Sequence, residues 1–136
     1  MRYIVDPQVI LDSLKGHSDA GKRALALLTV HLGDELILVP TSYLALAPAF
    51  MGVRAMEDRF LEKFGIRVAK GAPAKVMDVV YAAWSRYQQD HPRTTGGSSV
   101  FDQLYVGAYA LGYDGILTLR GDLYRRYFET LKIVDS

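Results

Sequence analysis

The chain contains no cysteine, and this absence excludes several kinds of chemistry. Disulfide bonds, thiolate nucleophiles and zinc sites built on cysteine are all ruled out. A chain without cysteine agrees with a reducing compartment, and we expect a cytoplasmic location. The sequence also lacks the pattern of a signal peptide, because Asp6 interrupts the first apolar stretch soon after it begins.

Long apolar runs and an excess of charge are also absent. The most apolar stretch, residues 43–53, contains Pro48 and is far shorter than the roughly 20 residues that cross a bilayer. The formal net charge is only +1, so any basic surface for nucleic acid must be local. We therefore expect no membrane partner and no general affinity for nucleic acid.

What is present is ordinary for a soluble globular protein. Of the 136 residues, 50% are hydrophobic and 23% are charged, which is enough to build one real core. We see no internal repeat and no low-complexity tract. The sequence therefore predicts a single domain over residues 1–136.

Apolar strand patterns alternate with helical patterns along the chain. The expected strands are 2–6, 35–39, 66–68, 115–119 and 131–134. Five of the expected helices are 7–15, 53–64, 73–89, 100–111 and 122–129. Another is expected between an N-cap at Ser18 or Asp19 and Gly33. A further helix is expected to be capped by Thr41 or Ser42 and to run to about Met51, with a kink or an early end at Pro48. This alternation predicts an α/β fold, a three-layer α/β/α sandwich with a central parallel sheet.

Three aspartates occupy comparable places in this pattern. Asp6 ends the first strand, Asp102 lies in the first turn of a helix, and Asp122 follows the strand 115–119. Parallel strands end at one edge of the sheet, so we expect these carboxylates to gather there. Gathered carboxylates repel unless a cation is present, and Mg²⁺ or Mn²⁺ accepts such oxygen ligands and can activate water. The three aspartates are therefore candidate metal ligands and catalytic residues.

The alternative interpretation is structural. All three aspartates lie at helix starts, where a carboxylate accepts backbone N–H bonds and interacts well with the helix dipole. Such capping stabilises a helix by roughly 0.5–2 kcal/mol without any catalytic role.

Four segments together resemble the PIN domain family, and most of all the small single-domain toxins of the VapC type. They are Tyr-Ile-Val-Asp-Pro-Gln-Val-Ile-Leu at 3–11, Leu-Val-Pro-Thr-Ser-Tyr-Leu-Ala at 38–45, Val-Phe-Asp-Gln-Leu-Tyr-Val-Gly-Ala-Tyr-Ala at 100–110 and Ile-Leu-Thr-Leu-Arg-Gly-Asp-Leu at 116–123. The resemblance spans nearly the whole chain. It implies a PIN-like α/β/α sandwich, a homodimer, a Mg²⁺- or Mn²⁺-dependent endoribonuclease, and neutralisation by a cognate antitoxin protein.

The chain departs from the family at two of its four acids. The first and third acids match Asp6 and Asp102, but the second falls at Leu46 and the fourth at Arg120. Asp122, two positions beyond the fourth, is a candidate replacement. The resemblance therefore implies a degenerate acidic site.

Arg120 changes the expected electrostatics. A guanidinium beside Asp6 and Asp102 would supply the positive charge that a metal ion normally provides, and it would repel a divalent ion. We therefore predict weak or absent binding of Mg²⁺ and Mn²⁺. The alternative is an exposed arginine that merely follows a strand.

Other residues are candidates for contacts with RNA. Ser98 and Ser99 precede a helix, where backbone N–H groups can hold a phosphate, and Arg93 could flank it; a flexible linker with a serine cap is the simpler interpretation. Arg120, Arg125 and Arg126 could form a small basic patch or a solvated helix face. Tyr105, Tyr109 and Tyr113 recur every four residues, and this spacing favours a packing or dimer stripe over base stacking.

Two functions remain open from the sequence. The first is a PIN-family endoribonuclease with impaired or unusual activity, in which Asp6, Asp102 and Asp122 hold the metal ion. The second is a catalytically silent PIN-like module that binds RNA or a protein partner. The resemblance gives a narrow preference to the first.

Overall fold

A computed structural model describes residues 1–93 and 99–136. Within these residues, five parallel strands form one sheet in the order β3-β2-β1-β4-β5. The strands are β1 (Arg2–Val5), β2 (Glu35–Leu38), β3 (Ile66–Val68), β4 (Gly115–Leu117) and β5 (Ile133–Val134). The predicted α/β fold with a central parallel sheet is confirmed, and it is consistent with a PIN-like fold.

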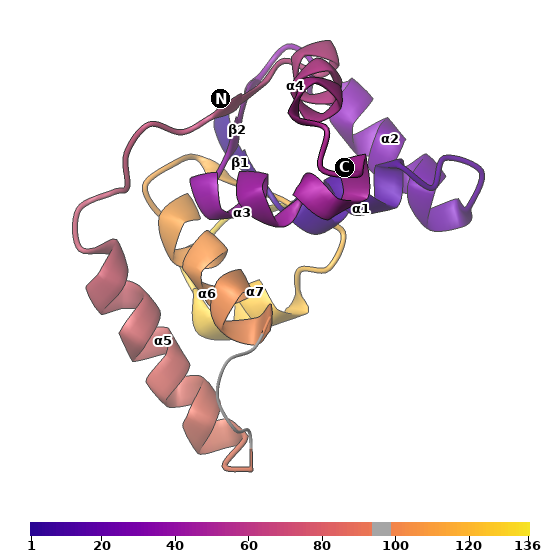
Figure 1. Cartoon of the computed structure of the whole chain (residues 1–136). Helices are drawn as coiled ribbons and strands as arrows, with labels where there is room; N and C mark the ends of the chain where they lie inside the picture. The colour runs from indigo at the N-terminus through magenta and orange to yellow at the C-terminus, as the bar shows by residue number, and fades with distance from the viewer. Residues whose placement is uncertain (94–98) are drawn as a thin grey trace.

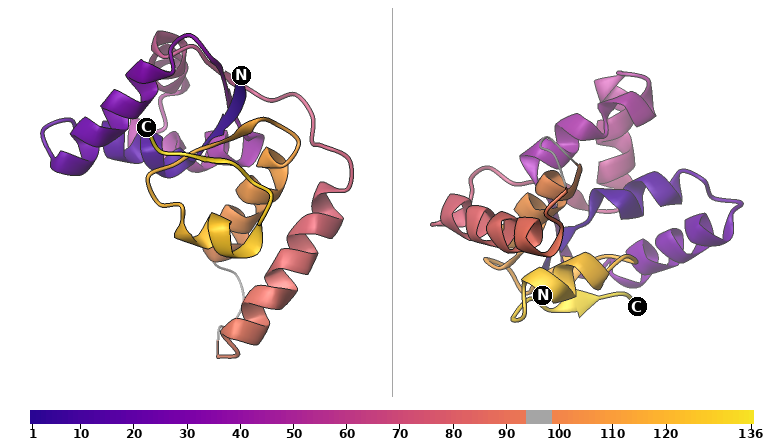
Figure 2. Two further views of the ribbon diagram at one scale, coloured as in Figure 1. Left: turned by 180° about the vertical axis from the view of Figure 1, so that it is seen from behind. Right: turned by 90° about the horizontal axis from the view of Figure 1, so that it is seen from below.

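Helices cover both faces of this sheet (Figure 1). They are α1 (Pro7–Ser13), α2 (Asp19–Val30), α3 (Pro40–Ala45), the 3-10 helix η1 (Ala47–Phe50), α4 (Arg54–Lys63), α5 (Val76–Asp90), α6 (Ser99–Ala110) and α7 (Asp122–Tyr127). The long helix α5 lies at one side of the molecule and α2 at the other, in both views of Figure 2. Within the described residues, no helix combines the length and apolar character needed to cross a bilayer.

The two faces of the sheet have separate hydrophobic cores, because successive strand residues point in opposite directions. Ile4, Ile37 and Ile116 pack against buried residues of α5, α6 and α7. Val5 and Leu38, one position further along their strands, pack on the opposite face with buried residues of α1, α2 and α4. The strands are apolar on both faces, as expected for a parallel sheet covered on both sides.

The third helical segment begins differently from the sequence-based expectation. We expected Thr41 or Ser42 to cap a helix that runs to about Met51, but α3 begins at Pro40, with Val39 as its N-cap residue and no side-chain cap. Proline at the first helical position already has the required φ angle and has no N–H to be capped. The early end at Pro48 is confirmed, because α3 gives way to η1 there.

The strand order places a site at one edge of the sheet. The chain moves from β1 outward to β2 and β3 and then crosses back to β4 on the other side of β1. At such a switch point, the segments that follow neighbouring strands diverge and leave a crevice at the carboxyl ends. The crevice is bordered by the residues that follow β1, β2 and β4.

Candidate functional site

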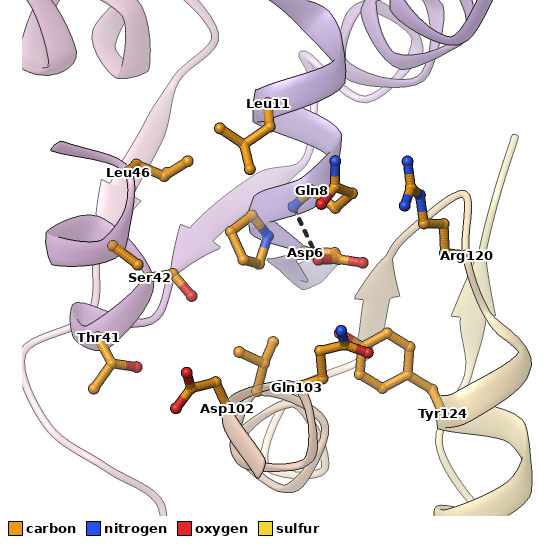
Figure 3. Close-up of a pocket in the computed structure, with 13 residues that line it drawn as sticks. Asp6, Gln8, Leu11, Thr41, Ser42, Leu46, Asp102, Gln103, Arg120 and Tyr124 are labelled. Atoms are coloured by element: carbon orange, nitrogen blue, oxygen red, sulfur yellow. Dashed lines mark hydrogen bonds between the residues drawn. The ribbon is translucent and has the colours of Figure 1, made fainter. Parts of the chain in front are cut away.

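A pocket of about 270 Å³ lies at this edge. Its walls come from the residues after β1, from α3, from α6, and from the segment between β4 and α7 (Figure 3). The residues that line it are Asp6, Pro7, Gln8, Leu11, Thr41, Ser42, Ala45, Leu46, Asp102, Gln103, Val106, Arg120 and Tyr124. Asp6, Asp102 and Arg120, which are far apart in the sequence, therefore share one pocket.

Asp6 is held rigidly at the base of this site. It follows β1 and is the N-cap of α1, and its Oδ1 accepts the backbone N–H of Gln8 at 3.0 Å. Its Oδ2 accepts the hydroxyl of the fully buried Thr118 at 2.7 Å. Burial raises the pKa of the Asp6 carboxyl, while the two hydrogen bonds and the charge of Arg120 partly offset that rise. The capping interpretation is thus correct for Asp6, and the same carboxylate also faces the pocket.

Asp12 is a second buried carboxylate, one that the sequence did not single out. It lies on α1, and its Oδ1 accepts the side-chain N–H of Gln8 at 3.0 Å. The same oxygen is 3.5 Å from a guanidinium nitrogen of Arg120. The guanidinium therefore pairs with Asp12, a partner that we had not expected, while its charge also acts on Asp6.

Arg120 reaches the pocket from the segment after β4. Its backbone N–H donates to the Thr118 hydroxyl at 3.0 Å, and that hydroxyl donates to Asp6. Its side chain is 64% exposed, so solvent screens part of its charge. Figure 3 shows Arg120 beside Gln8, on the opposite side of the pocket from Asp102.

The other side of the pocket is more exposed. Asp102, in the first turn of α6, and the next residue, Gln103, are exposed, as is Thr41 on α3. In Figure 3 the Asp102 carboxylate points toward Thr41 and Ser42. These side chains can adapt to a ligand, because solvent already surrounds them.

Tyr124 closes the pocket from α7. It is almost fully buried, and its hydroxyl has no hydrogen-bond partner in the described part of the chain. Burial raises the pKa of this phenol, and the negative charge of Asp6 raises it further. The close approach of α7 depends on Gly107 of α6, where an added Cβ would lie 2.5 Å from the ring of Phe128 and 3.0 Å from that of Tyr124.

Two of the remaining predicted site residues, Asp122 and Arg93, do not line this pocket. Asp122 is fully exposed and pairs with Arg125 at 3.5 Å. Arg93 is exposed and does not line the pocket. Ser98 lies outside the described residues, as does the side chain of Ser99, whose backbone begins α6.

The features proposed for RNA contacts are largely occupied by other interactions. Arg125 lies within 3.7 Å of Asp135 and also pairs with Asp122, while Arg126 pairs with Asp90 at 3.2 Å. In the tyrosine stripe, Tyr109 is buried and donates its hydroxyl to the carbonyl of Gly71. The packing interpretation is therefore correct for Tyr109, at the centre of that stripe. The basic patch of Arg120, Arg125 and Arg126 offers little positive charge that is not already paired with an acid.

The donor set does not fit a metal centre of the kind that the resemblance implies. No group of three or more His, Asp and Glu side chains in the described part of the chain is placed to hold a metal ion. At two of the positions where the resemblance implies an acid, this chain has Leu46, which offers no ligand atom, and Arg120, which is permanently charged. Hard divalent ions need several oxygen ligands and a negative local charge. The pocket provides Asp6 and Asp102 but also a cation.

Two residues of the site carried signals that sequence reasoning missed. Gln8 and Asp12 are spaced i,i+4, which puts both on one side of a helix that begins at the site. Tyr124 had no comparable signal, because a tyrosine in a short helix is usually part of the core.

Comparisons with family models, with curated proteins and with solved structures find no match to this chain. What is established is the class defined by the fold, a five-stranded parallel sheet with helices on both faces and a pocket at its carboxyl edge.

Proposed function

We propose that this chain is a catalytically silent PIN-like module that binds a protein partner, and that the partner inserts a basic side chain into the pocket. The balance of charge supports this proposal. Asp6 and Asp102 line the pocket, and Arg120, the only cation among the described lining residues, already pairs with Asp12. An entering cation is attracted to the two carboxylates, whereas an RNA phosphate without a metal ion is repelled.

The apolar part of the pocket supports the same kind of ligand. Leu11, Ala45, Leu46 and Val106 provide an apolar wall beside the two acids. Lysine and arginine have aliphatic stems that pack on such a surface while the charged end reaches polar groups. An antitoxin-like protein is the class of partner that the resemblance implies. The resemblance also implies a homodimer, and light scattering can test whether two copies of the chain associate.

A matched pair of peptides tests the proposal. We expect a capped Leu-Arg-Leu peptide to shift the amide resonances of residues around the pocket, because its guanidinium reaches the two carboxylates. The same peptide with citrulline in place of arginine, which is isosteric but neutral, should bind at least about tenfold more weakly. Asp102→Asn should weaken binding of the arginine peptide, and Asp122→Asn, outside the pocket, should not. Equal binding of the two peptides, or no binding of either, would contradict the proposal.

The metal-dependent endoribonuclease remains a second candidate, because Asp6 and Asp102 do line one pocket at the edge where the family's acids are expected. A cleavage assay on mixed RNA with Mg²⁺ or Mn²⁺ separates the two functions. We expect no cleavage above that of the Asp6→Asn variant. Cleavage that disappears in Asp6→Asn would support the nuclease and overturn the silent module.

A further inference from the structure

The pair formed by Arg120 and Asp12 has features that a chance surface contact would lack. The Asp12 side chain is 6% exposed, and a buried carboxylate needs compensating partners. It has them in the Gln8 side chain at 3.0 Å and the Arg120 guanidinium at 3.5 Å. An arginine that merely followed a strand would not need a buried acid directed toward it.

The backbone of Arg120 is fixed by the same group of residues. Its N–H donates to Thr118, and Thr118 donates to Asp6, so one hydroxyl connects the arginine to the other buried acid. The guanidinium also acts on Asp6 directly, where its positive charge favours the ionised form. The charge of the Arg120 guanidinium therefore acts on two buried carboxylates, those of Asp6 and Asp12.

We infer that Arg120, anchored by Asp12, is the resident cation of this pocket and keeps divalent metal ions out of it. The guanidinium provides the positive charge that Asp6 and Asp12 require, from a side chain that cannot lose its proton in the pH range of a folded protein. This inference concerns small divalent ions, which need several oxygen ligands at short range. It does not concern a single monovalent side chain that reaches Asp102 on the side of the pocket away from Arg120.

A charge reversal at position 120 provides the test. Arg120→Asp removes the resident cation and adds a third carboxylate to a pocket that already has Asp6 and Asp102. We expect the native protein to show no saturable binding of Mn²⁺ by calorimetry up to millimolar concentrations. Arg120→Asp should bind Mn²⁺ at least about tenfold more tightly. Adding Asp6→Asn to this variant should remove the gain.

Two further variants separate the local effect from a change in overall charge. Arg23→Asp makes the same substitution at an exposed position of α2, outside the pocket and away from any acidic pair, and should bring no gain in Mn²⁺ binding. Arg120→Lys retains a positive charge, so this variant should show no saturable Mn²⁺ binding, like the native protein. Micromolar Mn²⁺ binding by the native protein, or an equal gain in Arg23→Asp, would overturn the inference.

A milder variant keeps the test decisive if Arg120→Asp does not fold. Arg120→Gln leaves Asp6 and Asp12 without their cation, so we expect Mg²⁺ to raise its melting temperature while leaving that of the native protein unchanged. A melting temperature of Arg120→Gln that does not respond to Mg²⁺ would mean that the guanidinium is not acting as a counter-ion. These readouts measure metal alone, so their failure is distinct from a failure of peptide binding.

Discussion

The two sides of the pocket differ in how their polar groups are held. On the buried side, Asp6, Asp12 and Thr118 are nearly inaccessible to solvent, and each has defined hydrogen-bond or ion-pair partners. On the open side, Thr41, Asp102 and Gln103 are exposed. A fixed polar group contributes to stability and to a preorganised charge, whereas an exposed one can turn to meet a ligand. The buried side should therefore control folding, and the open side should control binding.

The largest difference in the loss of unfolding free energy is expected between alanine variants of two aspartates. Asp12→Ala removes the acceptor of the Gln8 side chain and the partner of Arg120, and it leaves a small cavity, so it should cost about 3 kcal/mol. Asp102→Ala, on the open side, should change the free energy of unfolding by no more than about 0.5 kcal/mol. Urea denaturation measures both, and equal losses would remove the distinction between the two sides.

A pair of threonines provides the next comparison. Thr118→Val keeps the shape of the side chain but leaves an Asp6 oxygen and the Arg120 N–H without their partner, which should cost about 2 kcal/mol. Thr41→Val on the open side should be within about 0.5 kcal/mol of the native protein. Thermal and urea unfolding of the two variants tests this, and a nearly neutral Thr118→Val would show that the connection between Arg120 and Asp6 contributes little.

The dependence of the free energy of unfolding on pH also distinguishes the two sides of the pocket, with a smaller expected effect. Burial raises the pKa of Asp6 above its ordinary value of 3.8, so the folded protein retains that proton to higher pH than the unfolded chain does. The free energy of unfolding should therefore fall as pH rises from 3.8 through the raised folded-state pKa. The hydrogen bonds from Gln8 and Thr118 limit the size of this effect.

The difference between native protein and variant isolates this contribution, because other groups titrate in both. Asp6→Asn should remove the fall in stability over that pH window, and Asp102→Asn should leave it in place. The free energy of unfolding of each variant at a series of pH values is the measurement. An unchanged profile in Asp6→Asn would assign the pH dependence to another acid.

The sequence predicted the fold and half of the site for one physical reason. Apolar strands that alternate with helices must form a covered parallel sheet, and the residues after such strands meet at one edge. That rule placed Asp6 at this edge, and a helix start expected at the same edge placed Asp102 beside it; both line one pocket. Asp122 obeyed the same rule in sequence, but it lies in the first turn of α7 with its side chain turned to solvent.

The rest of the site depended on tertiary packing that local patterns do not encode. The spacing of Asp12 from Gln8 puts both on one side of a helix, but no neighbouring residue in the sequence shows that the Asp12 carboxylate is buried. Its partner Arg120 is more than a hundred positions away and arrives only when β4 pairs with β1. Tyr124 likewise reaches the pocket because Gly107 lets α7 pack closely on α6.

The smallest effect is expected at Tyr124, which lies between the two sides of the pocket. Its hydroxyl is buried without a partner in the described residues, so Tyr124→Phe should be neutral or stabilising by up to about 1 kcal/mol. Tyr109→Phe is the matched control, because that hydroxyl donates to the carbonyl of Gly71 and its loss should cost about 1 kcal/mol. Urea unfolding compares the two variants. A larger loss in Tyr124→Phe than in Tyr109→Phe would show that the Tyr124 hydroxyl takes part in a stabilising interaction, and the buried side of the pocket would then extend to α7.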